Sequence, residues 1–268
     1  MDKCQILLTN DDGIQSPGLW AAAEALSDIG YVTVVAPRDQ CSGMGRSLPS
    51  TSDGIIRPQP LVVRGKEWTV YSVGGSPAQA VLHGMLEIMP CKPALVVSGI
   101  NYGENVATGI AISGTVGAAM EAAGMGVPAL AMSLETGVEH HLGYSREIDF
   151  STAAYFAAHF ARLLLEKSMP ADVDLLKVDV PSSATPQTPW QVTRLAHQHY
   201  FQPVPAKRAS WDEPGRMGYE FKPELGNEDD TDVHVLLVKR MVSVTPLSLD
   251  NTSRVSFSDL DGLLRGKG

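Results

Sequence analysis

Asp11 and Asp12 are adjacent carboxylates that follow a short apolar run at residues 6–8. Ser16 and Pro17 then open a pattern with apolar residues at helical spacing, which predicts a buried strand, a loop and a helix. In an open α/β sheet such a loop lies at the carboxyl end of a strand, where ligands bind. Two carboxylates beside an apolar core favour a bound cation, although the same residue types also suit an ordinary polar turn.

Two later loops place further oxygen atoms at the ends of predicted strands. Ser42 follows a β-branched run at residues 31–36, and Asn101 follows an apolar run at residues 94–98. Because the carboxyl ends of parallel strands meet at one edge of a sheet, these side chains are expected to converge with the paired carboxylates. Carboxylate, hydroxyl and amide oxygens suit Mg²⁺, Mn²⁺ or Ca²⁺ rather than zinc, which prefers nitrogen and sulfur. The spacing therefore predicts a divalent metal site with open positions for water and substrate.

Ser113, Gly114 and Thr115 open a predicted helix at residues 117–123. The unpaired backbone N–H groups and the positive dipole at a helix N-terminus bind phosphate without any Lys or Arg. Gly114 lets the backbone approach a ligand closely, and the two hydroxyls can donate hydrogen bonds to it. The alternative is that Ser113 only caps its helix, since Ser is a preferred N-cap residue.

Strand and helix patterns alternate through the first two thirds of the chain. Buried runs at residues 6–8, 31–36, 94–98 and 175–180 are separated by helical patterns, of which residues 148–166 are the longest. Such alternation predicts an α/β fold in which helices flank a mainly parallel sheet.

Several segments fall outside this alternation. From residue 181 to 227 the chain turns to Pro, Gln and aromatic residues, which predicts an extended hairpin or arm. We expect a catalytic core over residues 1–180 and an arm over residues 181–268 that returns to the core, together forming one integrated domain. The other predicted elements are a hairpin over residues 55–64 and 67–73, a helix or strand over 231–239, a strand over 241–245 that ends before Pro246, and a helix over 257–264.

The composition predicts a soluble cytoplasmic protein. The 268 residues carry a formal net charge of −9, which argues against a general grip on nucleic acid. No apolar run approaches the length of a membrane span, and the N-terminus lacks the layout of a signal peptide. Cys4, Cys41 and Cys91 are odd in number and too scattered for a metal knuckle, so they are expected to be reduced thiols.

Other residues that could do chemistry have simpler interpretations. Arg46 suits a phosphate contact and a solvated side chain equally well. His140 and His141 are expected in an exposed polar loop rather than in a lid over the site. Gly74 and Gly75 do not form a dinucleotide fingerprint, because no G-x-G-x-x-G follows the first strand, and this argues against a nicotinamide-dependent enzyme.

Five stretches of the chain resemble, in order, the motifs of the SurE family: TNDDGIQSPGLWAAAEAL, APRDQCSGMGRSL, VSGINYGENV, SGTVGAAMEAAGMGVPALAMS and VSVTPL. This resemblance covers nearly the whole chain, from Cys4 to about Leu247. It implies a metal-dependent nucleoside-monophosphate phosphatase on a Rossmann-like three-layer sandwich. It also implies that the C-terminal arm is exchanged between the subunits of a homodimer or homotetramer. The ligands implied for one divalent metal per subunit, Mg²⁺ or Mn²⁺ with Ca²⁺ as a further candidate, are Asp11, Asp12, Ser42 and Asn101.

The reaction expected from this resemblance is hydrolysis of nucleoside 5′- and 3′-monophosphates by a metal-activated water. Asp11 or Asp12 would act as the base for that water, and an aspartyl-phosphate on Asp11 is the competing route. A noncatalytic nucleotide- or metal-binding module on the same fold is the alternative function. The residues expected to contact substrate are Asn10, Gly43, Asn105, Ser113, Gly114 and Thr115.

Three stretches depart from the usual family pattern. Residues 75–79 read GSPAQ where Gly-Thr-Pro, a small residue and Asp are usual, and Ile112 stands where Tyr is frequent. Residues 175–180 read LLKVDV where an Asn-rich version is usual. None of these departures removes a proposed metal ligand. They bear on base preference and on the lining of the pocket.

Overall fold

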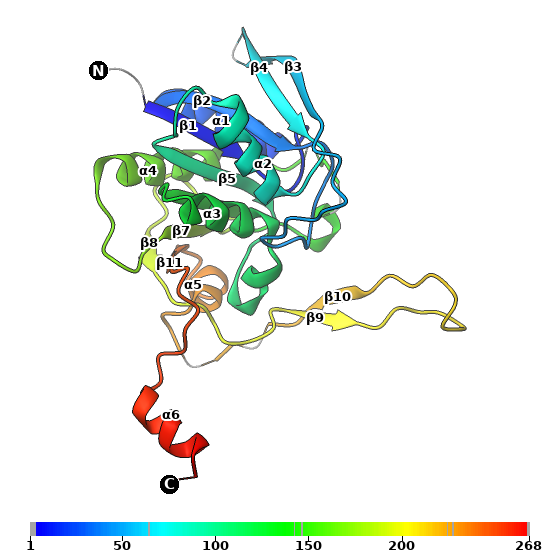
Figure 1. Ribbon diagram of the computed structural model, residues 1–268, viewed down its shortest axis with the longest axis vertical. Helices are drawn as coiled ribbons and strands as arrows, with labels where there is room; N and C mark the ends of the chain where they lie inside the picture. The colour runs from blue at the N-terminus through cyan, green and yellow to red at the C-terminus, as the bar shows by residue number, and fades with distance from the viewer. Residues whose placement is uncertain are drawn as a thin grey trace.

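The computed structural model describes residues 4–63, 65–141, 143–145, 147–223, 225–226 and 228–266. Within these residues the centre of the molecule is a nine-stranded sheet. Its strands are β1 (Cys4–Thr9), β2 (Gly30–Pro37), β3 (Ile56–Val63), β4 (Lys66–Val73), β5 (Leu95–Tyr102), β6 (Ala129–Leu134), β7 (Leu175–Val180), β8 (Trp190–Val192) and β11 (Val242–Leu247). Their order across the sheet is β3-β4-β2-β1-β5-β6-β7-β11-β8 (Figure 1).

The six strands from β4 to β7 in this order are parallel. β3 is antiparallel to β4, and β11 is antiparallel to β7 and parallel to β8. The predicted α/β class with a mainly parallel sheet is therefore confirmed. Residues 55–64 were expected as one arm of the β3–β4 hairpin, and Arg64 at its end lies outside the described residues.

Helices cover both faces of the sheet. α1 (Pro17–Leu26) and α4 (Ser151–Glu166) share one apolar cluster on one face, and α2 (Pro77–His83) and α3 (Gly114–Gly124) share another on the opposite face. β1 is buried on both sides, because Ile6 and Leu8 belong to the first cluster and Leu7 to the second. The result is the three-layer arrangement that the alternating pattern predicts. The short helical pieces between these elements are η1 (Gly84–Ile88), η2 (Ala107–Ile112) and η3 (Val138–His140).

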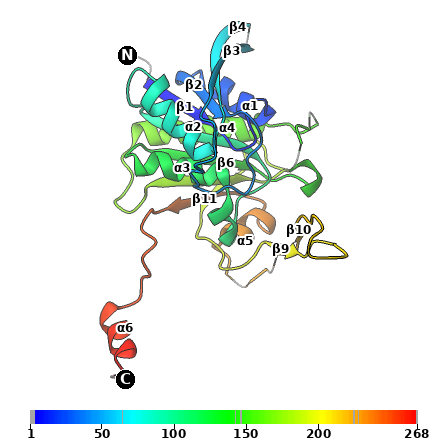
Figure 2. The same cartoon turned by 45° about the vertical axis from the view of Figure 1, so that its right-hand side comes forward.

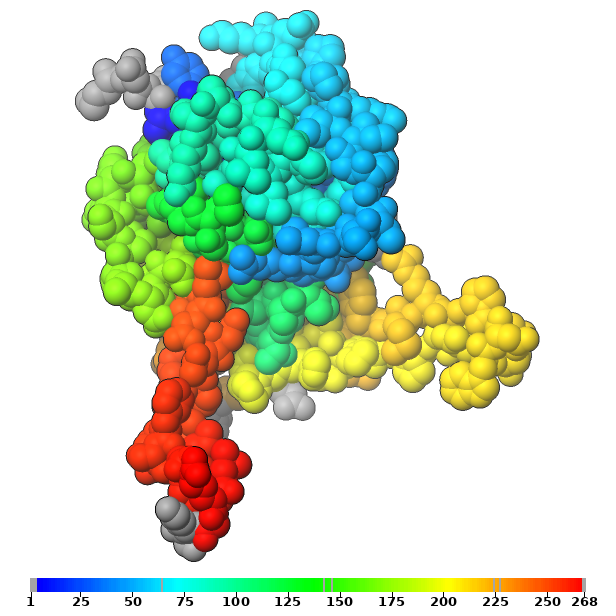
Figure 3. All heavy atoms as spheres, viewed as in Figure 1, coloured from blue at the N-terminus to red at the C-terminus, as the bar shows by residue number. Residues whose placement is uncertain are grey.

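Part of the C-terminal third adds strands to the sheet, and the rest projects away from it. β8 and β11 extend the sheet, and α5 (Asp232–Leu237) packs through Val233 and Leu236 against the buried Tyr200. β9 (Phe201–Val204) and β10 (Gly218–Phe221) pair antiparallel in the hairpin that the sequence predicts. This hairpin and α6 (Phe257–Leu264) project from the body in both views (Figures 1 and 2). Figure 3 shows them as separate yellow and red extensions of the surface. No helix in the described ranges is long and apolar enough to cross a membrane.

Two strand boundaries differ from the sequence prediction. β5 was expected to end at Ser98, but its ladder with β6 shifts register and resumes at Asn101, so Asn101 lies in the strand rather than in the following loop. β11 was expected to stop before Pro246, but it continues to Leu247. The Val244 carbonyl accepts the Thr193 N–H, so the backbone of Val244 faces β8. The nitrogen of Pro246, two residues later, faces the same side, but the ladder between β11 and β8 has ended by then. A proline there leaves no ladder hydrogen bond unmade.

Candidate active site

The loop after β1 carries the paired carboxylates in a turn that Asn10 closes. The Asn10 amide nitrogen donates to the Gly13 carbonyl at 3.0 Å, and its amide oxygen accepts the Gly13 N–H at 3.2 Å. Gly13 has a φ of +97°, and a Cβ there would lie 3.0 Å from the Tyr144 hydroxyl, so the turn requires glycine. Because both polar atoms of Asn10 are engaged in holding Asp11 and Asp12, its contact with substrate stays a prediction.

Asp11 connects the β1 loop to the N-terminus of α3. The Thr115 hydroxyl donates to Oδ1 of Asp11, and a Cβ built on Gly114 would lie only 2.9 Å from Oδ2. The Asp11 carbonyl accepts the Cys41 N–H at 2.7 Å, which brings the Ser42 loop to the same place. Burial raises the pKa of Asp11, and the hydrogen bond from Thr115 offsets part of that rise.

Asp12 connects the same loop to β5. Its Oδ2 accepts the Tyr102 N–H at 3.2 Å, and its Oδ1 accepts from the Gln40 amide at 3.3 Å. The Tyr144 hydroxyl donates to the Asp12 carbonyl at 2.9 Å. Burial, followed by the nearby charge of Asp11, raises the pKa of Asp12 well above its usual range. The two carboxylates are thus close enough to destabilise each other's charged forms.

Asn101 and Ser42 each adjoin a residue whose N–H bonds to the carboxylate loop, Tyr102 and Cys41 respectively. The Asn101 amide nitrogen donates to the Gly103 carbonyl at 2.7 Å and to the Tyr102 carbonyl at 3.2 Å, which turns its amide oxygen the other way as an acceptor. Ser42 is exposed on the loop that the Cys41 N–H attaches to the β1 loop. The structure therefore brings Asp11 together with Cys41 and α3, and Asp12 together with the residue after Asn101.

The donor set fits a divalent metal. Asp11 is 5 % exposed and Asp12 2 %, and none of the ion pairs of the described residues includes either carboxylate. Two buried carboxylates without a positive partner are costly unless they are protonated or bind a cation. Carboxylate, amide and hydroxyl oxygens are ligands for hard cations such as Mg²⁺, Mn²⁺ and Ca²⁺.

The N-terminus of α3 combines the two interpretations of Ser113. Its hydroxyl oxygen accepts the Val116 N–H at 3.1 Å, so it caps the helix, and its own proton is left for another acceptor. Thr115 uses its proton on Asp11 instead of keeping it for a phosphate. What this helix end offers to an anion is therefore the backbone around Gly114, together with the Ser113 hydroxyl.

Asn105 and Gly43 occupy different environments. The Asn105 amide nitrogen donates to the Ser133 hydroxyl at 2.8 Å, and its backbone N–H donates to Oδ1 of Asp179 at 2.8 Å. Ser133 is the β6 partner of Asn101, which places the Asn105 amide near the strand end that carries a predicted ligand. Gly43 is exposed, has a φ of +80°, and has open space around it. Contacts of Asn105 and Gly43 with substrate stay predictions.

The structure also shows the surroundings of Arg46 and His141, for which the sequence favoured simpler interpretations. Arg46 pairs with Glu121 at 2.6 Å rather than standing free in solvent. His141 was expected in an exposed loop but is partly buried against the hairpin, with its ring 5.8 Å from that of Phe201 and its Nδ1 3.2 Å from the Tyr219 hydroxyl. The expectation was wrong because the hairpin, which lies some sixty residues later in the chain, covers this loop.

Glu104 is a further buried carboxyl close to this region. It is 7 % exposed, and burial raises its pKa to about 7. The charged and titratable groups around it are Tyr200, Glu135, Asp179 and Arg240. In the folded protein the neutral acid is therefore favoured up to near neutral pH.

Glu104→Gln is expected to remove a pH dependence of stability. The folded pKa lies above the usual value of 4.5, so folding holds a proton that the unfolded chain has lost. The stability contributed by neutral Glu104 is complete below about pH 4.5 and is lost as the pH rises through about 7. Urea titrations give the free energy of unfolding of both proteins at each pH. As the pH rises from about 4.5 to above 7, the value for Glu104→Gln should increase relative to that of the wild type by roughly 3 kcal/mol. A constant difference would contradict this.

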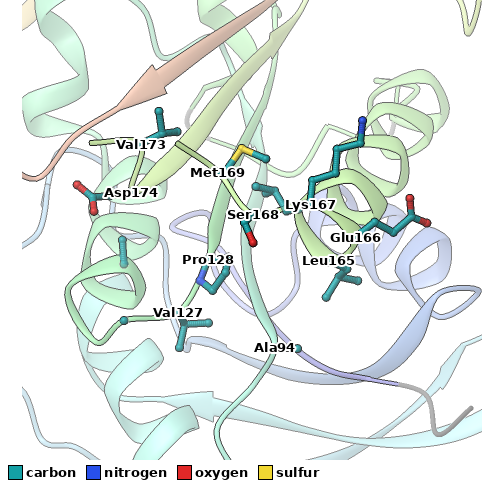
Figure 4. A pocket seen from close by; sticks show the side chains of 13 residues that line it. Ala94, Val127, Pro128, Leu165, Glu166, Lys167, Ser168, Met169, Val173 and Asp174 are labelled. Atoms are coloured by element: carbon teal, nitrogen blue, oxygen red, sulfur yellow. The ribbon is translucent and has the colours of Figure 1, made fainter. Parts of the chain in front are cut away.

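A hollow of about 510 Å³ lies elsewhere in the molecule (Figure 4). Its lining includes Ala94, Pro128 and Asp174, which precede β5, β6 and β7, together with the end of α4 at Glu166 and Lys167. It therefore opens at the amino ends of the parallel strands, opposite the edge that carries the carboxylates. None of the predicted site residues lines it.

Comparison with known proteins decides the family. A sequence profile described as survival protein SurE matches residues 6–202. The chain belongs to the SurE family. The 5′-nucleotidase SurE of Thermococcus gammatolerans is 41% identical over an alignment of 268 positions that covers 98% of this chain and 97% of the relative. The 5′-nucleotidase SurE of Methanosarcina mazei is 40% identical over an alignment of 271 positions that covers 97% of each chain. The SurE crystal structure from Aquifex aeolicus matches with a TM-score of 0.74 and 32% identity, covering 97% of this chain and 99% of the other.

Several residues around the SurE-family site were not found from the sequence. Gln40 and Tyr144 hold Asp12 from two different loops, and nothing in their local sequence indicates that contact. Lys177 and Asp179 did carry a signal, because two charges alternate within the otherwise apolar strand β7. That pattern is typical of a buried ion pair, which the structure contains.

Proposed function

We propose that this SurE-family protein is a divalent-metal-dependent phosphatase that hydrolyses nucleoside 5′- and 3′-monophosphates to nucleoside and phosphate. The observation that carries the proposal is the buried pair Asp11 and Asp12, which has no cationic partner among the described residues and lies against the N-terminus of α3. The names of its relatives, 5′-nucleotidase SurE, support the same reaction.

The metal would be held by oxygen atoms from two loops and from the carboxyl end of β5, with Mg²⁺ or Mn²⁺ as the expected ion and Ca²⁺ as a further candidate. A bound ion of this kind supplies Lewis-acid chemistry and lowers the pKa of a bound water. The chain's own residues fix the carboxylates, since Thr115 donates to Asp11 and Gln40 donates to Asp12. The proposed ligands are Asp11, Asp12, Ser42 and Asn101.

The phosphoryl group would lie at the N-terminus of α3. Backbone N–H groups near Gly114 and the Ser113 hydroxyl proton face charge that builds on the phosphoryl oxygens during the reaction. Asn105 has a second amide proton besides the one that it gives to Ser133, and this proton is available to the same oxygens. On this proposal Asp11 or Asp12 accepts the proton of the attacking water.

We further propose that the protein is a homodimer or homotetramer assembled through its C-terminal arm. The β9–β10 hairpin exposes Tyr219 and Phe221 along its strands, and Trp211 between them is 93 % exposed. Exposed aromatic residues of this kind are typical of interfaces. A cytoplasmic location is proposed because Cys4, Cys41 and Cys91 are all free.

Phosphate release from a panel of nucleoside monophosphates tests the proposed function. The wild type is expected to release phosphate with Mg²⁺ or Mn²⁺, and a chelator should stop the release. Paired 5′- and 3′-monophosphates of each base would rank the substrates. The competing function is a noncatalytic nucleotide- or metal-binding module. It would be favoured by a folded protein that binds Mn²⁺ and releases no phosphate from any of these compounds.

A further inference from the structure

A buried charge cluster lies under the loop that connects β5 to α3. Lys177 Nζ contacts Oδ2 of Asp179 at 2.5 Å and Oδ2 of Asp232 at 3.2 Å, and all three side chains are 0 % exposed. Burying three charged groups is expensive, and such clusters are a weak source of stability by themselves. The role of the cluster is therefore sought in the other hydrogen bonds of Asp179 and Asp232.

Each carboxylate also holds a backbone N–H of the loop. Asp179 Oδ1 accepts the Asn105 N–H at 2.8 Å, and Asp232 Oδ2 accepts the Ala107 N–H at 2.9 Å. Ala107 has a φ of +55°, which is unfavourable for a residue with a Cβ and persists only where surrounding contacts hold it. The cluster therefore fixes the loop at two points, one of them strained.

The loop fixed in this way joins the two halves of the proposed site. It begins just after Asn101, a proposed metal ligand, and continues through η2 to Ser113 at the start of α3. The Asn105 side chain donates to Ser133, and Ser133 is in register with Asn101 on one side and with Asp179 on the other. A continuous row thus connects Asp179 to the strand end that carries the metal ligand.

We propose that Asp179, held by Lys177, is a positioning residue that aims the Asn105 amide at the phosphoryl group of the substrate. This inference rests on the proposed function and adds to it a residue that touches neither metal nor substrate. Replacing Asp179 by Asn leaves an acceptor for the Asn105 N–H only if the amide nitrogen faces the Lys177 ammonium, where two donors meet. The variant must therefore give up one of the two contacts.

The test is a double-mutant cycle with Asp179→Asn, Asn105→Ala and the two combined. Asp179→Asn alone is expected to lower kcat about tenfold or more, the usual size for a residue that orients an active-site group. In the Asn105→Ala background the same change should lower kcat less than about twofold, because the group that Asp179 positions is already gone. An equal loss in both backgrounds, or no loss in either, would overturn the inference.

Glu135→Gln is a matched control. Glu135 also holds a cation, Arg240 at 2.5 Å, and a backbone N–H, that of Ser182 at 2.8 Å. Its loss should lower the melting temperature and leave kcat and KM unchanged. If Asp179→Asn does not fold, Lys177→Gln combined with Asp179→Asn removes both charges and enters the same cycle. Phosphate release by the wild type is measured first, and its absence would count against the proposed function rather than against this inference alone.

Discussion

Asp12→Asn is expected to reduce metal-dependent phosphate release by at least about a hundredfold and to make the metal-free protein more stable. Activity falls because the substitution removes a charged ligand from the proposed metal site. Stability rises because burial and the charge of Asp11 raise the pKa of Asp12, so the wild type bears the cost of a buried like-charged pair at neutral pH. A gain of about 1 kcal/mol would raise the melting temperature by about 2–4 °C.

The melting temperature with and without Mn²⁺ measures both effects together. Mn²⁺ should stabilise the wild type, since a ligand that binds only the folded state shifts unfolding, and should stabilise Asp12→Asn much less. Asp39→Asn is the control, because its side chain is 78% exposed on a neighbouring loop and pairs only with Arg38 in the ion pairs of the described chain. A metal-free Asp12→Asn protein less stable than the wild type would contradict the account of the carboxylate pair.

Gly114→Ala is expected to weaken metal binding and to lower kcat/KM by up to about a hundredfold, the usual cost of displacing active-site groups by about 1 Å. A Cβ at this position would lie 2.7 Å from Cβ of Asp11, 2.9 Å from its Oδ2 and 3.1 Å from Cγ of Pro77. Asp11 is held by Thr115 and cannot move aside without leaving its place in the site. Helix propensity alone would favour Ala over Gly by about 1 kcal/mol, so a loss cannot come from that source.

Gly109→Ala is the matched control for this variant. It lies in η2, a few residues before Gly114, and a Cβ there would meet nothing within 4 Å. Its kinetics should match the wild type. Steady-state kinetics and Mn²⁺ titration of the two variants would show whether the close approach of α3 to Asp11 matters. Equal activity of Gly114→Ala and wild type would mean that it does not.

The framework of the fold could be predicted from local patterns. β1 contains the apolar run at residues 6–8 with helix-start residues after it, and the burial of that run on both faces follows from the pattern alone. The boundary at Asn101 could not be predicted, because β5 resumes only through pairing with β6 across a register shift. Pro246 stays in β11 for a similar reason, since the neighbouring strand has already ended there.

Some features of the proposed site could be predicted from the sequence, and others could not. The proximity of Asp11 and Thr115 follows from two loops at one edge of a parallel sheet, which the order of the elements predicts. Which oxygen the Thr115 hydroxyl would face could not be predicted, because that depends on side-chain packing across more than one hundred residues of chain. Tyr144 and His141 were beyond prediction as well, since they lie in a loop whose sequence has neither strand nor helix periodicity.

The position of Mn²⁺ in crystals soaked with the ion, located by its anomalous scattering, tests the proposed metal site most directly. We expect a peak at direct bonding distance, roughly 2.0–2.6 Å as for Mg²⁺ and Ca²⁺, from oxygen atoms of the proposed ligands. Those ligands are Asp11, Asp12, Ser42 and Asn101. A peak at any other position, in crystals of a protein whose phosphate release depends on Mn²⁺, would contradict the proposed ligand set.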